Sequence, residues 1–336
     1  MAMNPFERLK PPPKLKDIED AAFRRASKAA SSISYAKSPV YTARRREIAR
    51  INALSDAVIA AVERCLEVAK AYMSAHEFYR EVVSLYYKKD EIIENYRRLR
   101  GLIRVINNLR SYYVAQIKAA SDDREMAEIR REAMGRIASV LKRRGDLIEY
   151  FREMHRFARG LPSIAFDSPL VVVAGPPNAG KSSLVRAIST AEPEVAEYPF
   201  TTKTLSIGHF TIDGHVVQIM DTPGLLDRPM EERNEIEKQA ILALSLVADA
   251  MIYLFDPSPF MYYPLEVQAR ILREIEENFK KVAIIRVVNK VDIKAVDVDS
   301  LGYPDLIEIS AVTGQGMDRL MARLKEVLEP VFSGKG

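Results

Sequence analysis

The segment 170–183, LVVVAGPPNAGKSS, constrains the fold more than any other part of the sequence. A short apolar run at 170–174 predicts a buried strand, and a helical pattern begins directly after the segment's second glycine. Four residues separate Gly175 from Gly180-Lys181-Ser182, which is the spacing of a phosphate-binding loop. In such a loop the backbone N–H groups converge on an anion, and the positive end of the following helix adds to the attraction. We therefore expect strand, loop and helix in that order.

The residue types in this loop have distinct expected roles. Gly175 and Gly180 let the backbone approach where a Cβ would clash. Lys181 is expected to reach the β- and γ-phosphates of a nucleotide, and Ser182 to bind Mg²⁺. The candidate phosphate site consists of nine consecutive residues: Gly175, Pro176, Pro177, Asn178, Ala179, Gly180, Lys181, Ser182 and Ser183. The alternative, a glycine turn that binds nothing, is disfavoured by the position of the loop between a strand and a helix.

Length and composition exclude several classes of protein. The 336 residues suffice for two domains, and a hydrophobic fraction of 48% with mixed charge is typical of a globular chain. No apolar run approaches the ~18–20 residues of a membrane span. The N-terminal segment lacks the apolar core of a signal peptide, so we expect a cytoplasmic protein without membrane partners. Cys65 is the only cysteine, which excludes a disulfide framework and a cysteine-based metal site.

Charge divides the chain into two halves of opposite sign. Residues 1–160 contain 33 Lys and Arg against 21 Asp and Glu, a net charge of +12. The remaining 17 basic and 25 acidic residues give residues 161–336 a net charge of −8. The basic half predicts contact with a polyanion. The alternative is a solvated helical surface without a partner.

Two domains follow from the periodicity of the apolar residues. Residues 1–16 form a Pro-rich, basic arm, and from 17 to 160 apolar residues recur at spacings of three and four, which predicts a bundle of about four helices. Gly101 and the segment 121–123 are expected to separate helices, with Ser121 or Asp122 as an N-cap. Residues 161–169 are expected to form a linker.

From 170 to 332 the pattern alternates between strand and helix, which predicts an α/β domain with a mostly parallel sheet flanked by helices. Asp213-Gly214 predicts a hairpin turn between two of the strands. The expected strands are 170–174, 206–211, 216–221, 250–256, 282–289 and 306–310. The expected helices begin near 181 and cover about 234–247, 265–278 and 317–328.

Basic triplets occur on the polar faces of the expected bundle, at 44–46, in 97–100 and at 142–144, with frequent tyrosines nearby. Arginine with aromatic side chains suits phosphate contact and base stacking on RNA. The alternative is that the tyrosines lie in the core and the basic residues are ordinary exposed charges of helices. For any single residue this alternative is about as good an explanation as RNA binding. Nothing in the sequence points to a DNA-specific reader.

Further motifs follow the loop in a fixed order. Asp221-Thr222-Pro223-Gly224 ends an expected strand, where Asp221 can hold Mg²⁺ through a water and the Gly224 N–H can contact a γ-phosphate. Asn289, Lys290 and Asp292 end a later strand, and the Asp292 carboxylate can accept hydrogen bonds from two adjacent N–H groups of guanine, which adenine does not offer. Together these motifs predict a GTP or GDP site.

Two more segments complete the expected site. After the last strand, Ser310-Ala311 would present the Ala311 N–H to the guanine carbonyl. The segment 198–203, YPFTTK, is the expected place for a mobile switch that supplies a threonine to Mg²⁺. Thr201 and Thr202 compete for that role, and Thr202 is favoured.

With these motifs in view, the second half resembles the translation-factor-related GTPases close to the Obg group, through GPPNAGKSS, YPFTTK and DTPGLLDRP. The whole chain resembles the nucleolar GTP-binding protein family, through the opening NPFERLKPPPKLKDIEDAAFRRA, the helical half and the segment YLFDPSP. That family implies GTP hydrolysis linked to assembly of the large ribosomal subunit, with rRNA, the subunit precursor and ribosome assembly proteins as partners. Eukaryotic members continue into a long C-terminal extension, so the resemblance fits a short, archaeal-type member.

The expected catalytic groups are Lys181, Thr202, Gly224 and Asn178. Many related GTPases orient the attacking water with a glutamine just after the DxxG segment, but here Leu225-Leu226 follows, which predicts slow intrinsic hydrolysis. Asn178 lies where related GTPases use an asparagine to help hold K⁺, so potassium-stimulated hydrolysis is a further hypothesis. The alternative function is a GTP-binding scaffold that recruits protein partners without appreciable hydrolysis.

Overall fold

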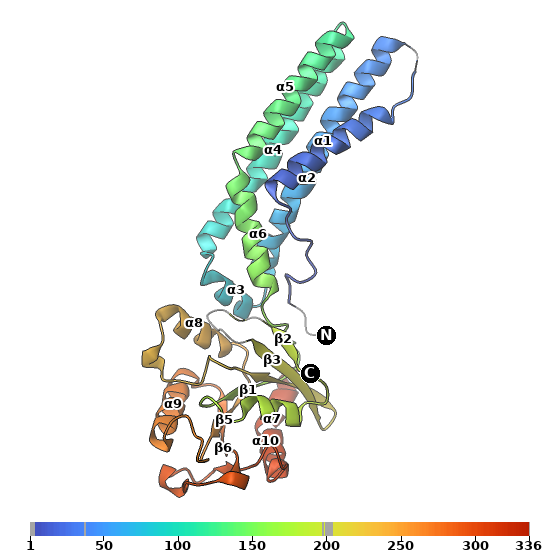
Figure 1. Ribbon diagram of the computed structural model, residues 1–336. Coiled ribbons are helices and arrows are strands. Elements are labelled where there is room, and N and C mark those ends of the chain that lie inside the picture. Colours follow the sequence, from blue (N-terminus) through green and yellow to red (C-terminus); the bar gives the residue numbers. More distant parts are fainter. Residues whose placement is uncertain (1–3, 37, 197, 199–203, 336) are drawn as a thin grey trace. The chain divides into compact units, whose positions relative to one another are not determined.

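Figure 1 shows a computed structural model of the chain. The structure describes residues 4–36, 38–196, 198 and 204–335. Within those residues, no helix combines the length and the apolarity that crossing a membrane requires.

The chain forms two compact units. One, here called the helical unit, comprises Pro5–Ala75 and Tyr86–Arg159. The other, the sheet unit, comprises Met1–Asn4, His76–Leu85 and Gly160–Gly336. The segment His76–Leu85 therefore belongs with the sheet, although the residues on both sides of it belong to the helical unit.

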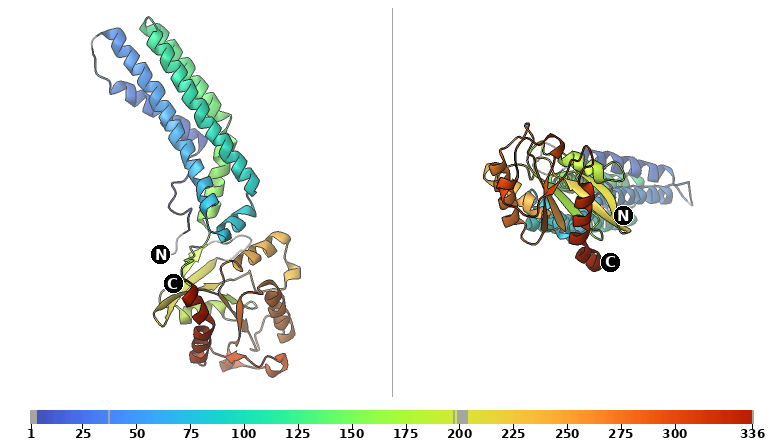
Figure 2. Two further views of the ribbon diagram at one scale, coloured as in Figure 1. Left: turned by 180° about the vertical axis from the view of Figure 1, so that it is seen from behind. Right: turned by 90° about the horizontal axis from the view of Figure 1, so that it is seen from below.

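The helical unit is organised around one long helix. Its helices in the described part of the chain are α1 (Leu15–Ser31), α2 (Pro39–Ser74), α4 (Lys89–Ala119), α5 (Asp123–Lys142) and α6 (Gly145–Arg159). Helix α2 packs against the other four, and Figures 1 and 2 show α2, α4 and α5 running side by side. The buried residues of α2 recur every three or four positions, as the sequence predicts: Ile51, Leu54, Val58, Val62, Leu66 and Ala69.

The ends of these helices agree only partly with the sequence-based expectation. Asp122 is the N-cap of α5, with its carboxylate accepting a hydrogen bond from the Glu125 N–H at 2.9 Å, as predicted. The expected break at Gly101 was wrong, because α4 runs through Gly101 without interruption. A single glycine costs a helix only about 1 kcal/mol relative to alanine. Packing along the 31 residues of α4 outweighs that cost.

The described residues of the sheet unit form a central seven-stranded sheet, in the order β2-β3-β4-β1-β5-β6-β7. The strands are β1 (Leu170–Ala174), β2 (Glu194–Ala196), β3 (Leu205–Ile212), β4 (His215–Asp221), β5 (Ala250–Phe255), β6 (Ala283–Val288) and β7 (Ile307–Glu308). Strands β4, β1, β5, β6 and β7 are mutually parallel, and β3 pairs antiparallel with both β2 and β4. The turn between β3 and β4 has φ of 48° at Asp213 and 85° at Gly214, which confirms the predicted hairpin.

The described residues of this unit also form helices. They are α3 (Glu77–Ser84), α7 (Lys181–Ile188), α8 (Glu235–Leu244), α9 (Leu265–Asn278) and α10 (Met317–Lys335), with short 3₁₀ turns η1 (Met230–Glu232), η2 (Val291–Ile293) and η3 (Asp299–Leu301). Leucines of α7 and α10 share one hydrophobic cluster with alternate residues of the central strands. All residues of β1 and β5 are buried, as expected for central parallel strands.

Helix α3 is attached to the sheet unit by buried contacts. It packs against α8, and the Tyr79 hydroxyl donates to the Pro162 carbonyl oxygen at 2.8 Å. The Gln218 side chain of β4 accepts from the Ala165 N–H and donates to the Ala165 carbonyl oxygen, both at 2.8 Å. The segment 161–169 that leads into β1 is thus held by hydrogen bonds within this unit.

Candidate functional site

The loop between β1 and α7 has the backbone geometry that its glycines allow. Gly175 has φ of +137°, and a Cβ there would lie 2.5 Å from the Leu254 carbonyl oxygen. Gly180 has φ of +93°, and a Cβ there would lie 2.3 Å from Nδ2 of Asn289. Since an L side chain fits neither position, both glycines are required by the fold of the loop.

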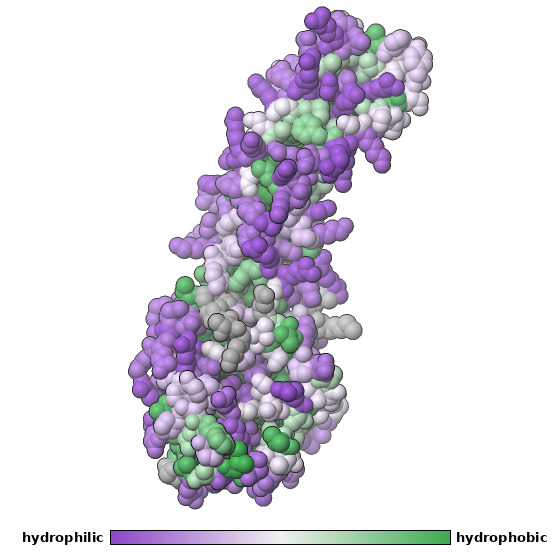
Figure 3. Space-filling view, viewed as in Figure 1, coloured by the Kyte–Doolittle hydropathy of each residue, from purple (hydrophilic) through white to green (hydrophobic). Residues whose placement is uncertain are grey.

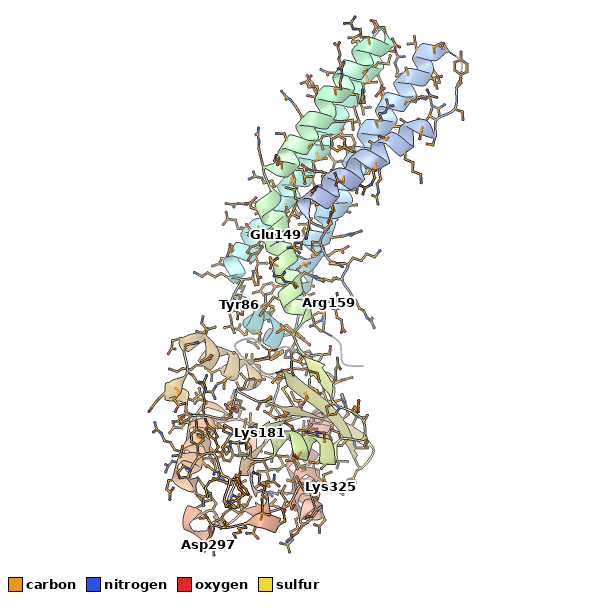
Figure 4. All side chains as sticks on the ribbon, in the orientation of Figure 1. Tyr86, Glu149, Arg159, Lys181, Asp297 and Lys325 are labelled. Carbon is orange, nitrogen blue, oxygen red and sulfur yellow. The ribbon has the colours of Figure 1, made fainter. Side chains whose placement is uncertain are left out.

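Lys181 opens α7 and is buried, with 6% of its surface exposed. Its Nζ donates to the carbonyl oxygens of Gly175 and Pro176 at 2.8 Å each. Figure 4 labels this side chain at the centre of the sheet unit. The loop therefore wraps around the ammonium group of Lys181. This group supplies a positive charge that can bind a phosphate.

Asp221 is the last residue of β4, and its carboxylate accepts a hydrogen bond from the Ser182 hydroxyl. The next residue, Thr222, is fully buried, and its hydroxyl donates to the Val173 carbonyl oxygen of β1 at 2.7 Å. This bond fixes the end of β4 beside the loop. A hydroxyl and a carboxylate in contact supply the hard oxygen ligands that Mg²⁺ prefers, so the residues present fit this metal.

The segment after Asp221 folds back on the loop. The Gly175 N–H donates to the Leu226 carbonyl oxygen at 3.1 Å, and the side chains of Leu225 and Leu226 are buried. The Gly224 N–H donates to Oδ2 of Asp227 at 2.9 Å. Arg233 donates to the carbonyl oxygen of Gly224 at 3.2 Å, and burial lowers the pKa of its guanidinium.

A cavity of about 350 Å³ brings these elements together. Its lining residues are Pro177, Asn178, Gly180, Lys181, Ser182, Ser183, Arg186, Pro223 and Asp227. The sequence did not point to Arg186 or Asp227. Arg186 lies four residues after Ser182 in α7, so helical spacing would have placed both on one face.

On the other side of the loop, one asparagine joins two expected parts of the site. Asn289 follows β6, and its Nδ2 donates to the Ala179 carbonyl oxygen at 2.8 Å. Its Oδ1 accepts from the Ala311 N–H at 3.0 Å. Ser310, next to Ala311, is fully buried, and Asp292 is exposed in η2.

Lys290 has a left-handed backbone, with φ of 63°, and its Nζ lies 2.7 Å from Oδ2 of Asp256. Asp256 directly follows β5 and is fully buried. No sequence motif marks Asp256, because its partner comes from the end of a different strand. Thr201 and Thr202, the predicted metal ligands, lie outside the described residues.

The fold and this arrangement define the class of protein: a P-loop GTPase domain preceded by a helical domain. Residues 170–290 match the family model described as 50S ribosome-binding GTPase, and residues 6–165 match that of the NOG1 N-terminal helical domain. The chain belongs to the NOG1 family of nucleolar GTP-binding proteins, which confirms the resemblance seen in the sequence.

Similar proteins include an uncharacterized protein of Methanocaldococcus jannaschii, which is 30% identical over 86% of this chain and 81% of that protein. Nucleolar GTP-binding protein 1 of Drosophila melanogaster is 34% identical over 65% of this chain, but the match covers only 33% of that protein. The matches to proteins of that name in Saccharomyces cerevisiae and Caenorhabditis elegans cover 42% and 49% of those proteins. A crystal structure assigned to nucleolar GTP-binding protein 1 of Plasmodium falciparum covers 52% of this chain and 93% of that one, at 30% identity and a TM-score of 0.45.

Proposed function

We propose that this protein hydrolyses GTP to GDP and phosphate and acts in assembly of the large ribosomal subunit through nucleotide-dependent binding to rRNA. The observation that carries the proposal is the convergence of the 175–183 loop, Asp221 and Asn289 at the carboxyl ends of parallel strands of one sheet. Ligands of α/β sheets bind at that edge. The helical domain and the names of the relatives support the ribosomal part.

In this proposal the phosphates bind to residues 175–183, with Lys181 on the β- and γ-phosphates. Ser182, Asp221 through a water, and Thr202 or Thr201 would hold Mg²⁺, which supplies positive charge at the phosphates when bound. The Gly224 N–H would contact the γ-phosphate. Guanine would be recognised by three residues after β6, Asn289, Lys290 and Asp292, and by the Ser310-Ala311 segment.

Hydrolysis without an activator is expected to be slow. Leu225 and Leu226 are buried and apolar, so neither can orient a water molecule by a hydrogen bond. Asn178 lines the cavity with a left-handed backbone, φ 65°, and is the group we assign to a potassium ion. Faster turnover in KCl than in NaCl would support this assignment, and equal rates would contradict it.

We assign RNA binding to the helical unit. In the sequence, the proposed RNA-binding domain covers residues 17–160, and the basic arm 1–16 precedes it. Arg97, Arg98 and Arg100 are exposed on α4, and residues 142–144 are exposed at the end of α5. Figure 3 shows hydrophilic residues covering most of the visible face of these helices. Exposed basic side chains are the groups that bind phosphate backbones. A cytoplasmic location fits this role.

Titration with fluorescent GTP, GDP and ATP tests the nucleotide assignment. We expect binding of both guanine nucleotides, no ATP binding, and loss of binding in Lys181→Ala. Asp292→Asn should weaken GTP binding at least tenfold and improve binding of xanthosine triphosphate, because the amide can donate to the carbonyl that replaces the amino group of guanine. Equal affinity of the wild-type protein for GTP and ATP would contradict the assignment.

The second candidate function is a GTP-binding scaffold that recruits protein partners without appreciable hydrolysis. The buried Leu225 and Leu226 favour it, because no water-orienting side chain follows Gly224 directly. Turnover distinguishes the two functions: a scaffold binds GTP and never releases phosphate, even when large ribosomal subunits are present.

A further inference from the structure

Asp227 lies between the phosphate cavity and the backbone that would serve a γ-phosphate. The residue is buried, with 8% of its surface exposed, and it lines the cavity together with Lys181 and Ser182. Oδ2 of Asp227 accepts the hydrogen bond of the Gly224 N–H at 2.9 Å. The backbone donor assigned above to the γ-phosphate is therefore bound to an anionic side chain of the same loop.

Arg233 holds this carboxylate in place. Its guanidinium lies 3.6 Å from Oδ1 of Asp227 and donates to the carbonyl oxygens of Gly224 at 3.2 Å and Arg228 at 3.1 Å. Only 1% of the Arg233 side chain is exposed. The 224–233 loop is thus closed on itself by one buried ion pair and its backbone contacts.

We propose that Asp227 is a specificity-determining residue that sets how strongly the protein discriminates GTP from GDP. The inference rests on the proposed GTPase function. A γ-phosphate and the Asp227 carboxylate are both anions that require the Gly224 N–H, so they compete for one donor and repel each other across the cavity. GDP has no group at that position and does not compete. GTP binding must therefore move Asp227, whereas GDP binding leaves the contact with Gly224 intact.

This competition has a signature that a structural role does not share. If Asp227 only stabilised the loop, its loss would change the affinities for GDP and GTP by the same factor. If it competes with the γ-phosphate, removing its charge improves GTP binding selectively. Hydrogen bonds to charged groups are stronger than neutral ones, so relief of the competition should strengthen GTP binding at least about tenfold.

The test is the ratio of Kd for a non-hydrolysable GTP analogue to Kd for GDP, measured on the full chain by fluorescent-nucleotide titration with Mg²⁺. In Asp227→Asn the amide oxygen still accepts from Gly224 but the charge is gone, and we expect the ratio to fall about tenfold. Asp227→Ser should lower the ratio similarly, because its hydroxyl can also accept a hydrogen bond. This second variant replaces the first if Asp227→Asn folds poorly. Glu231→Gln is the matched control, because this exposed side chain of the same loop pairs with Arg270 and does not line the cavity.

An unchanged or raised ratio in a folded Asp227 variant would overturn the proposal. An equal change in both affinities would assign Asp227 a structural role instead. Failure of the wild-type protein to bind either nucleotide would contradict the proposed function itself, so the two failures are distinguishable.

Discussion

Asn289 uses both ends of one amide to join the phosphate-binding loop to the segment after β7. Its Nδ2 donates to Ala179 and its Oδ1 accepts from Ala311, with only 2% of the residue exposed. Gly180 leaves room for this amide, since a Cβ there would lie 2.3 Å from Nδ2. The geometry of the phosphate side and of the expected base side therefore depends on one side chain.

Asn289→Ala should weaken both GTP and GDP binding by at least tenfold, because it leaves the Ala179 carbonyl and the Ala311 N–H without this partner. Fluorescent-nucleotide titration measures the loss. Asn278→Ala is the control, since the Asn278 amide donates to the Glu274 carbonyl oxygen within α9. Equal affinities of Asn289→Ala and the wild type would show that the two loops hold their positions independently.

At this scale the sequence predicts residues that belong to a contiguous motif, such as the 175–183 loop. It does not predict Asp227 or Asp256, whose partners are set by how strands and loops meet. Asp256 contacts Lys290 from the end of a different strand, and Asp227 binds Gly224 only because the loop folds back. Neither contact has a spacing signature.

Helix α3 and helix α8 meet around one buried tyrosine. The Tyr198 hydroxyl donates to the Ala240 carbonyl oxygen of α8 at 2.8 Å, and its ring stacks on Phe78 of α3 at 6.3 Å between centroids. Burial raises the pKa of Tyr198 well above its ordinary value. Tyr198 is the first residue of the 198–203 segment expected to act as a switch, and α8 follows the loop that carries Asp227. Helix α3 therefore contacts one end of the expected switch and the helix that follows the Asp227 loop.

Tyr198→Phe should lower the free energy of unfolding of the sheet unit by about 1 kcal/mol, because the Ala240 carbonyl loses its side-chain donor while the ring packing remains. Tyr198→Ala should cost about 3–5 kcal/mol through the cavity that it leaves. Denaturant unfolding followed by far-UV circular dichroism measures both changes. Tyr262→Phe, an exposed tyrosine, is the control, and a loss of equal size there would contradict the assignment.

His155 of α6 gives the helical unit a pH dependence. Its ring Nε2 lies 3.2 Å from the Phe6 carbonyl oxygen, both residues are buried, and burial lowers the pKa of His155 below its ordinary value of 6.5. Below pH 6.5 the unfolded chain binds a proton that the folded chain resists, so the free energy of unfolding decreases as pH falls.

His155→Gln should reduce this decrease between pH 7.5 and pH 5.5, because the amide can donate to Phe6 without titrating. Urea unfolding at the two pH values, followed by far-UV circular dichroism, gives the difference. His215→Gln, at an exposed position, is the control variant. The same decrease in His155→Gln as in the wild type would show that other groups cause it.

The order of helices and strands follows well from periodicity, since each predicted strand from 170 to 310 has a counterpart in the sheet. Strand β2 and the unit to which helix α3 belongs do not follow from periodicity. Strand β2 is short and largely exposed, so it has no apolar pattern. Helix α3 lies within the helical half of the sequence but belongs to the sheet unit, because its partners are far away in the chain.

Over the whole molecule, the basic and acidic halves predict that RNA binding depends on the helical unit. Replacing Lys142, Arg143 and Arg144 by glutamine should weaken binding of the full chain to rRNA and reduce the slope of log K against log salt by about 2 to 3. The matched control replaces the exposed Arg273, Lys280 and Lys281 of the sheet unit by glutamine. Equal effects of the two triple variants would show that net charge alone matters.

GTP turnover by the full chain, measured with and without large ribosomal subunits, tests the central claim most directly. Phosphate release should be slow for the protein alone, because Leu225 and Leu226 supply no water-orienting group, and faster when subunits are added. Lys181→Ala sets the background, since it removes the ammonium group that the loop surrounds. Phosphate release no greater than that of Lys181→Ala under both conditions would contradict the claim that this protein is a GTPase acting on the ribosome.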